Sequence, residues 1–431
     1  MKKTLLSLIV IVFTFSILAA CTNTSNSSES STQSSNKPIE ITFMHILGGD
    51  QGKAIDKIAD NFNKSQTKYV VKPVFESGNY QGLVEKLQAL LVTKKLPDVV
   101  MNGLNFTNYF NDNMPIVPAQ TFIDKEQTDL SDFYPNMLEL GKGKDGKQYA
   151  MPFAVSTPVL YYNKDMFKKA GLDPENPPKT FEELRKAAKT LTTGDQYGMF
   201  YDYTISGAWM FQAMVETMGG QMAADDGKSV AFNSEPGKKA LQHWVDLVNN
   251  DKSMPKMEGT QPLQAFTSGK LGMYAYSTGA VNQIEGESKF ELGVAPFPTD
   301  GEHQRKIPAG GNNLYVMKST PEKEKGAWEF IKYATSTEGT TIVAKDMGYM
   351  ATRKSAVEGQ GLLGTYLNEN PLAKVTYTQL EDMVPWNNYS GADGTRIYKV
   401  IQDNIDAALN NQKTVDQAIK DAANKANNLL K

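Results

Sequence analysis

Apolar residues in the first part of the chain recur at two alternating spacings. Residues 39–44 alternate apolar and polar side chains, which is the spacing of a β-strand with one buried face. Residues 51–62 then carry apolar side chains at helical spacing. The same order follows with a strand at 69–74, a helix marked by Leu83, Leu87, Leu90 and Leu91, and a strand at 99–101. This alternation predicts an α/β fold with parallel strands.

The same alternation continues toward the C-terminus. Predicted strands cover residues 157–163, 271–276 and 314–318. Predicted helices cover residues 209–218, 236–248, 322–334, 397–409 and the segment after 414. Thr180 and Glu183 form a capping box that starts a further helix. About 390 residues take part in this pattern, which is enough for two domains.

The first 20 residues have the composition of an export signal. Two lysines precede an apolar stretch at 5–17, and small residues follow it before Cys21. The apolar stretch is short for a spanning helix, which needs about 20 residues, although an uncleaved anchor is the alternative. The residues LAAC that end at Cys21 resemble the lipobox of bacterial lipoproteins. That resemblance implies cleavage before Cys21 and diacylglycerol on its sulfur.

A polar tether at residues 21–38 follows the signal. Residues 22–37 contain no apolar side chain, so they cannot help to form a core. As a flexible coil they would hold the folded body roughly 20–25 Å from the membrane on average. Cys21 is the one cysteine of the chain. If it carries lipid, the body has no thiol for disulfides, metal ligation or nucleophilic catalysis.

The charges and motifs argue against several classes of function. The formal net charge is −3 and no basic run occurs, so we expect neither nucleic acid nor an acidic lipid surface as partner. Residues 141–147 match the start of a P-loop but fail at Gln148, and a hairpin suits them better. The histidines at 45, 243 and 303 are scattered, so no metal-ligand spacing exists. No G-x-S-x-G elbow occurs either. We expect no enzyme and no cofactor.

Four blocks of sequence carry a family resemblance. They are STPVLYYNKDMFKKAGLDP at 156–174, AFTSGKLGMYA at 265–275, AGGNNL at 309–314 and GYMA at 348–351. Their order and spacing resemble the family 1 extracellular solute-binding proteins of ABC importers, over nearly all of the chain after the tether. The first block is most similar to the branch that binds glycerol-3-phosphate and to its sugar-binding cousins.

The resemblance implies two α/β lobes joined by hinge strands, with the ligand in the cleft between them. One lobe would comprise residues 39–150 plus 306–346, and the other residues 155–300 plus 350–431. Closure around the ligand is then a hinge motion. The resemblance also implies a monomer that delivers its ligand to the transmembrane subunits of a permease, and through them to an ATPase.

The resemblance also assigns cleft residues, namely Tyr80, Gln81, Ser156, Trp209, Gly311, Asn312 and Tyr349. The phosphate-binding branch has an acidic residue where Gln81 stands and an arginine near Gly391. Here the nearest arginine is Arg396, at the start of a predicted helix. Because arginine is the preferred bidentate partner of phosphate, its displacement favours a neutral sugar over a phosphorylated ligand.

The residues themselves point to the same ligand class. Trp386 opens the loop WNNYSG, in which two aromatic residues flank two amides. Sugar C–H faces stack on aromatic rings and sugar hydroxyls pair with amides. We therefore expect a neutral mono- or oligosaccharide stacked on Trp386 and Trp209, with Gln81 pairing with its hydroxyls. Each tryptophan has core packing as its alternative, and core packing is the expectation for Trp244 and Trp328.

Two functions of other classes stay open on the sequence. One is a lipid-anchored glycan hydrolase that uses two carboxylates, since 48 acidic residues do not exclude a chance pair. The other is a non-enzymatic adhesin. Whether a free oligosaccharide is bound and returned unchanged separates these alternatives.

Overall fold

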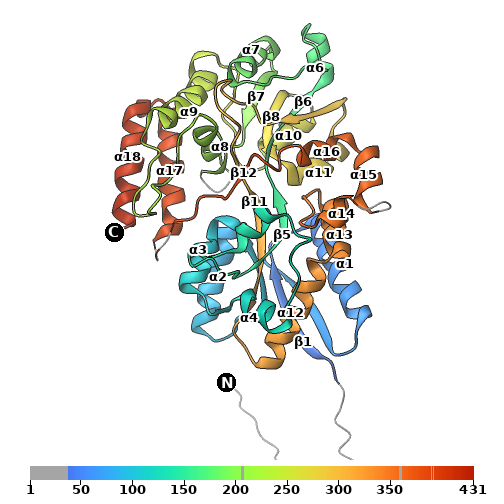
Figure 1. Cartoon of the computed structure of the whole chain (residues 1–431). Coiled ribbons are helices and arrows are strands. Elements are labelled where there is room, and N and C mark those ends of the chain that lie inside the picture. Colours follow the sequence, from blue (N-terminus) through green and yellow to red (C-terminus); the bar gives the residue numbers. More distant parts are fainter. Residues whose placement is uncertain (1–36, 205–207, 359–361, 390, 392) are drawn as a thin grey trace, which may run out of the picture. The chain divides into compact units, whose positions relative to one another are not determined.

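Two β-sheets organise the chain from Pro38 onward (Figure 1). The computed structural model describes residues 37–431, except 205–207, 359–361, 390 and 392. The predicted signal, Cys21 and nearly all of the tether therefore lie outside the described residues. Within the described part of the chain, no helix combines the length and the apolar character needed to cross a membrane.

The first sheet, here the β1 sheet, has the strand order β2-β1-β3-β11-β4, with β5 also beside β11. Its strands are β1 (Ile39–His45), β2 (Tyr69–Phe75), β3 (Val99–Gly103), β4 (Ile116–Val117), β5 (Met151–Ser156) and β11 (Gly310–Met317). The prediction of parallel strands is right for β1, β2 and β3. It is wrong for β11, which runs antiparallel to β3, β4 and β5 because the chain re-enters this sheet from the other one.

The helices of the β1 sheet include the three that the sequence predicts, near residues 51–62, 83–91 and 322–334, and four that it does not predict. They are α1 (Gly49–Ser65), α2 (Tyr80–Val92), α3 (Thr107–Asn113), α4 (Ala119–Glu126), α5 (Pro135–Leu138), α12 (Pro321–Ala334) and α13 (Thr337–Met347). Helix α1 buries Ile55, Ile58 and Phe62, which are the apolar positions of its sequence pattern. Trp328 on α12 is 1% exposed, which confirms its place in the core.

The second sheet, here the β6 sheet, has the order β7-β8-β6-β9. Its strands are β6 (Pro158–Asn163), β7 (Tyr197–Tyr201), β8 (Leu271–Ser277) and β9 (Leu292–Pro296). Strand β6 pairs antiparallel with β8 and β9, so the prediction of parallel strands holds here for β7 and β8 alone. Local periodicity indicates where a strand lies, but its direction depends on long connections.

The remaining helices either lie on the β6 sheet or pack on other helices. They are α6 (Lys164–Lys169), α7 (Phe181–Leu191), α8 (Trp209–Thr217), α9 (Glu235–Val245), α10 (Gln261–Thr267), α11 (Val281–Glu287), α14 (Lys354–Glu358), α15 (Leu363–Glu369), α16 (Pro371–Tyr377), α17 (Gly394–Leu409) and α18 (Val415–Leu429). The predicted capping box of α7 is present, with Thr180 and Glu183 each accepting from the other's backbone N–H. Trp244 on α9 is fully buried and confirms its predicted core position.

Three chain segments connect the two sheets. Strand β5 ends at Ser156 in the β1 sheet, and β6 begins two residues later in the other. Strand β10 (Ile307–Pro308) pairs with β12 (Met383–Val384) directly before β11 begins. Met350 forms an isolated bridge with Val155. Figure 1 shows β5 and β11 between the two groups of elements, and the candidate site lies around them.

Candidate ligand-binding site

The start of β11 brings together residues of the β1 sheet and of helix α8. Gly310 pairs with Ser156 and Asn312 pairs with Gly103. A Cβ atom placed on Gly310 would lie 2.7 Å from the Trp209 ring and 2.8 Å from Ser156 Oγ. The ring and the hydroxyl therefore meet directly over this glycine. Two predicted site residues from separate elements thus become neighbours.

Gly311 is required by the backbone conformation of β11 and by its close approach to β5. Its φ of +100° lies in a region that side chains other than glycine disfavour. An added Cβ would also collide with the carbonyl oxygen of Ala154 on β5. The resemblance predicted Gly311 as a site residue, and the structure gives the glycine a backbone reason that needs no ligand.

Three polar side chains surround Gly103 at the carboxyl end of β3. The Asn312 amide donates to the Tyr80 hydroxyl at 3.0 Å across 232 residues of sequence. A Cβ on Gly103 would lie 2.7 Å from Asn105 Oδ1 and 2.8 Å from the Tyr80 ring. Tyr80 and Asn312 were both predicted, whereas Asn105 was not. Together they form a small polar group beside Trp209 and Ser156.

Several polar atoms of this group are buried without a hydrogen-bond partner among the described residues. They are Asn312 Oδ1, both amide atoms of Asn105, and Trp209 Nε1. Asn105 is 2% exposed and Trp209 is also 2% exposed. Leaving such an atom unpaired costs about 1–3 kcal/mol, so native proteins normally satisfy it. The group therefore suits a ligand that brings its own hydrogen-bonding hydroxyls.

Tyr349 and Tyr276 extend the group around Tyr80. Burial, and then the nearby Tyr349, raise the pKa of Tyr80 well above its usual value. Burial raises the pKa of Tyr349 itself to about 12. The pKa of Tyr276 is raised by burial and then by Asp202 and Tyr349. These phenols stay neutral at physiological pH and can donate or accept hydrogen bonds.

Asp202 is the buried carboxyl group nearest to these tyrosines. It accepts from the Tyr274 hydroxyl at 2.8 Å and from Thr204 Oγ1 at 2.7 Å. Tyr276 stacks on Tyr274 with ring centroids 4.9 Å apart. Burial raises the pKa of Asp202. The carboxyl group thus orients one ring of the stacked pair.

Gln81 lies at the edge of the group. Its amide donates to Glu85 Oε1 at 3.1 Å. Gln81 also borders a cavity of about 580 Å³, together with Asn105, Thr204 and Arg396. The Arg396 side chain is 67% exposed and pairs with Asp393 at 2.9 Å. Gln81 and Arg396 are far apart in the sequence, and the fold brings them to the same cavity.

Trp386 packs directly behind Trp209. Its side chain is 4% exposed and the two ring centroids are 5.7 Å apart. Trp386 also lines a separate cavity of about 370 Å³, with Gln212, Glu216 and Asn387. The predicted pair of tryptophans is thus brought together, with both rings largely buried by protein. Their stacking on a ligand stays a prediction.

Glu216 is the unusual acid of this second cavity. It accepts from Gln212 Nε2 at 3.0 Å. Burial raises the pKa of Glu216 to about 7. The sequence offers no signal for this burial, because the segments that pack around helix α8 are distant in the chain.

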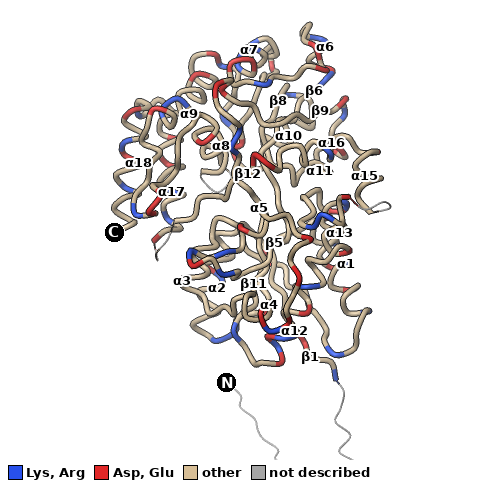
Figure 2. Tube along the Cα trace, viewed as in Figure 1, with Lys and Arg blue, Asp and Glu red and all other residues tan. Residues whose placement is uncertain are grey.

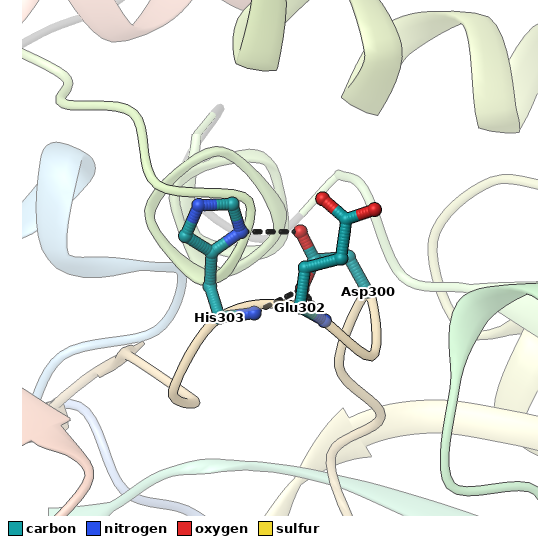
Figure 3. Close-up of side chains that lie close together, drawn as sticks. All are labelled: Asp300, Glu302 and His303. Atoms are coloured by element: carbon teal, nitrogen blue, oxygen red, sulfur yellow. Dashed lines mark hydrogen bonds and ion pairs between the residues drawn. The ribbon is translucent and has the colours of Figure 1, made fainter.

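Figure 3 shows the one cluster of possible metal ligands among the described residues, formed by Asp300, Glu302 and His303. His303 Nδ1 lies 2.7 Å from Asp300 Oδ2, and the Asp300 carboxylate accepts from the backbone N–H groups of Glu302 and His303. Glu302 and His303 are exposed. These bonds explain the cluster as an exposed turn. The P-loop-like segment is a hairpin, as expected, because Gly143 N–H donates to the Lys147 carbonyl at 2.9 Å.

Two classes of site residue escaped the sequence analysis. Asn105 follows the buried strand β3, and Asp202 follows β7. Ligands of α/β sheets bind beyond the carboxyl ends of strands, so polar residues at these ends were a usable signal. Tyr276 lies within a strand and had no such signal.

Comparisons with known proteins identify relatives of this chain. A family model described as "Bacterial extracellular solute-binding protein" matches residues 57–374. The sn-glycerol-3-phosphate-binding periplasmic protein UgpB of Yersinia pseudotuberculosis is 29% identical over 409 residues, covering 91% of this chain and 92% of the relative.

Solved structures share the fold over most of the chain. A cyclic alpha-maltosyl-1,6-maltose binding protein from Arthrobacter globiformis has a TM-score of 0.78 at 25% identity, covering 91% of this chain and 99% of that one. UgpB from Mycobacterium tuberculosis, in complex with glycerophosphocholine, has a TM-score of 0.83 at 22% identity, covering 91% and 98%.

Proposed function

Because the chain belongs to the bacterial extracellular solute-binding proteins of ABC transporters, we propose that it captures a neutral sugar or oligosaccharide and delivers it to an importer. The family binds solutes and does not catalyse reactions, so the hydrolase alternative is set aside. The importer's transmembrane subunits and their ATPase would be the protein partners.

The observation that carries this proposal is the set of unpaired, uncharged polar atoms around the start of β11. Both amide atoms of Asn105, the Asn312 Oδ1 and the Trp209 indole N–H have no described partner. Tyr80 and Tyr349 add neutral phenols. A sugar presents many hydroxyls on a partly apolar ring, so it can satisfy these atoms without burying a charge. We propose all eight predicted residues, including Gln81 and Trp386, as the wall of this site.

Glycerol-3-phosphate, or a related phosphodiester, is the second candidate ligand. The UgpB relatives at 29% identity favour it, as does the position of Arg396 on the same cavity as Gln81. Arg396 is largely exposed and already paired with Asp393, so solvent weakens its attraction for a phosphate. The neutral groups lie deeper, which is why we rank the sugar first.

We propose that residues 39–150 plus 306–346 form one lobe, and residues 155–300 plus 350–431 the other. Gln51 Nε2 donates to the Gly279 carbonyl at 3.0 Å, and Asn108 Nδ2 donates to the Asn388 carbonyl at 3.2 Å. These bonds join the proposed lobes on two sides of the site. The arrangement therefore suits a closed state, and hinge motion about the connecting segments would open it.

We also propose that Cys21 carries a lipid anchor on the extracytoplasmic face of the membrane, on the lipobox resemblance described above. Two or three acyl chains anchor a protein lastingly, whereas one does not. Metabolic labelling with a tagged fatty acid tests this. Label on the wild type and none on Cys21→Ala is expected, and label that persists on the variant would refute it.

A ligand panel tests the proposed ligand class. We expect mono- or oligosaccharides to raise the melting temperature, and calorimetry to give one site per chain. A ligand at 100 times its dissociation constant adds about 2.7 kcal/mol to the free energy of unfolding. Tight binding of glycerol-3-phosphate without any sugar response would overturn the proposal in favour of the second candidate. Chromatography should return a bound oligosaccharide unchanged.

A further inference from the structure

The C-terminal end of α2 exposes an apolar tip. Val92 is 84% exposed, the largest value among the exposed large hydrophobic residues of the described chain, and Leu91 beside it is 37% exposed. The buried residues of α2 are Leu83, Val84 and Leu87, so Val92 lies off the face that packs inward. Leaving this much apolar surface in water is unfavourable and indicates a contact surface.

This tip lies at the opposite end of the β1 sheet from the candidate site. Helix α2 starts at Tyr80, which bonds to Asn312 in the site. Its 13 residues carry the chain about 20 Å away at 1.5 Å per residue. The parallel strands β1, β2 and β3 begin at this far end, where Ile39 N–H donates to the Lys68 carbonyl. The folded unit itself begins there, at Pro38.

Lysines from separate segments gather at the same end. They are Lys64, Lys68, Lys94 and Lys95, all exposed. Among the ion pairs of the described chain, none involves these four lysines. The carboxylate of Asp98, just before β3, is paired with Lys323 at 2.9 Å. In β1, Glu40 carries an exposed carboxylate. Basic and acidic segments are interspersed over the body, and the end that carries these lysines also has acidic segments, such as the one with exposed Glu322, as Figure 2 shows.

We propose that this basal patch, defined as Leu91, Val92, Lys68, Lys94 and Lys95, docks on the anionic lipid surface of the membrane that holds the anchor. Exposed apolar side chains flanked by lysines suit a lipid headgroup region, where the apolar side chains insert and the ammonium groups meet phosphates. The sequence pattern predicted no acidic lipid partner, because the lysines form no run. The fold assembles them.

The tether strengthens an otherwise weak contact between the basal patch and the membrane. It enters the folded unit at the same end as the patch, and its 16 or so residues span roughly 20–25 Å. The body therefore meets the membrane as an intramolecular partner at high effective concentration. In this pose the candidate site lies on the side of the β1 sheet away from the membrane, where external solute arrives. The docking rests on the proposed lipid anchor.

A unique cysteine tests the contact directly. The folded body has no cysteine of its own, so Val92→Cys can carry a single environment-sensitive fluorophore on the lipidated full chain. We expect blue-shifted emission, quenched by lipid-borne quenchers, in vesicles of phosphatidylcholine with phosphatidylglycerol. Pure phosphatidylcholine or raised salt should remove the signal. Glu175→Cys, exposed beside α6, is the matched control and should stay solvent-exposed in both vesicles.

A double variant that reverses two charges tests whether the lysines of the basal patch bind the lipid surface. Lys94→Glu with Lys95→Glu should lower the inserted fraction at least tenfold, because each lysine near an anionic surface strengthens binding about fivefold. Lys420→Glu with Lys425→Glu on α18 makes the same charge change and should have no effect. A label that stays solvent-exposed in anionic vesicles, or shifts only when permease subunits are present, would overturn the proposal. Failure of the anchor would show separately as loss of flotation, and sugar affinity of all variants should be unchanged.

Discussion

Asn105 and Asn313 provide a matched test of what a buried amide does in this protein. Both side chains are buried, at 2% and 0% exposure. Neither amide atom of Asn105 has a described partner. Asn313 Nδ2 instead donates to the Leu140 carbonyl at 2.8 Å and to Thr107 Oγ1 at 3.3 Å. The same substitution, Asn→Leu, therefore removes a ligand-facing group at one position and a structural one at the other.

The structure predicts opposite outcomes for the two variants. Asn105→Leu removes two unpaired polar atoms, so the free energy of unfolding without ligand should stay constant or rise by about 1 kcal/mol. Sugar affinity should fall about 10- to 100-fold. The hydroxyls of the sugar lose hydrogen bonds to Asn105 that contribute about 1.5–3 kcal/mol in total to the binding free energy. Asn313→Leu removes the 2.8 Å hydrogen bond to the buried Leu140 carbonyl, which keeps only the longer one from Thr107 Oγ1 at 3.4 Å. It should lower the free energy of unfolding by about 1–3 kcal/mol with little change in affinity.

Denaturant unfolding without ligand and titration calorimetry with the best sugar of the panel give both quantities. A ligand-facing role for Asn105 would be refuted if Asn105→Leu lowered stability as much as Asn313→Leu while affinity stayed the same. That outcome would mean that Asn105 is satisfied within the protein and does not face a ligand.

Three further predictions concern single residues. Glu216 has a folded-state pKa near 7, above its usual 4.5, so its contribution to stability is full below pH 4.5 and lost as the pH rises through 7. Glu216→Gln should therefore match the wild type at pH 4 and exceed it by on the order of 2 kcal/mol at pH 8 in denaturant unfolding, and equal pH profiles would contradict this. Gly311→Ala should cost about 3 kcal/mol or more, seen as a lower melting temperature, because of its positive φ and the Ala154 carbonyl. Gly286→Ala, with open space around it in helix α11, is the control and should not lower the melting temperature. Trp386→Ala should reduce both the free energy of unfolding, by about 3–5 kcal/mol, and sugar affinity by calorimetry, since the ring is buried against Trp209; unchanged stability would show that the ring is not core.

Local pattern determined the elements and the family of this protein. The helix that begins at Thr180 and the inward face of α1 depend on contacts within a few residues, so spacing and capping residues predict them. Four short blocks in fixed order carried the family resemblance, which the match over residues 57–374 confirms. Trp244 and Trp328 were placed in the core for the same local reason and are buried.

Tertiary structure alone decided the direction of β11 and the composition of the site. Asn312 meets Tyr80 across 232 residues, and Trp209 meets Trp386, because β11 returns to the β1 sheet after the chain has built the other one. The burial that raises the pKa of Glu216, and the absence of described partners for Asn105, likewise arise from packing between distant segments. Periodicity carries no information about such contacts, since it records which face of an element is buried and not what buries it.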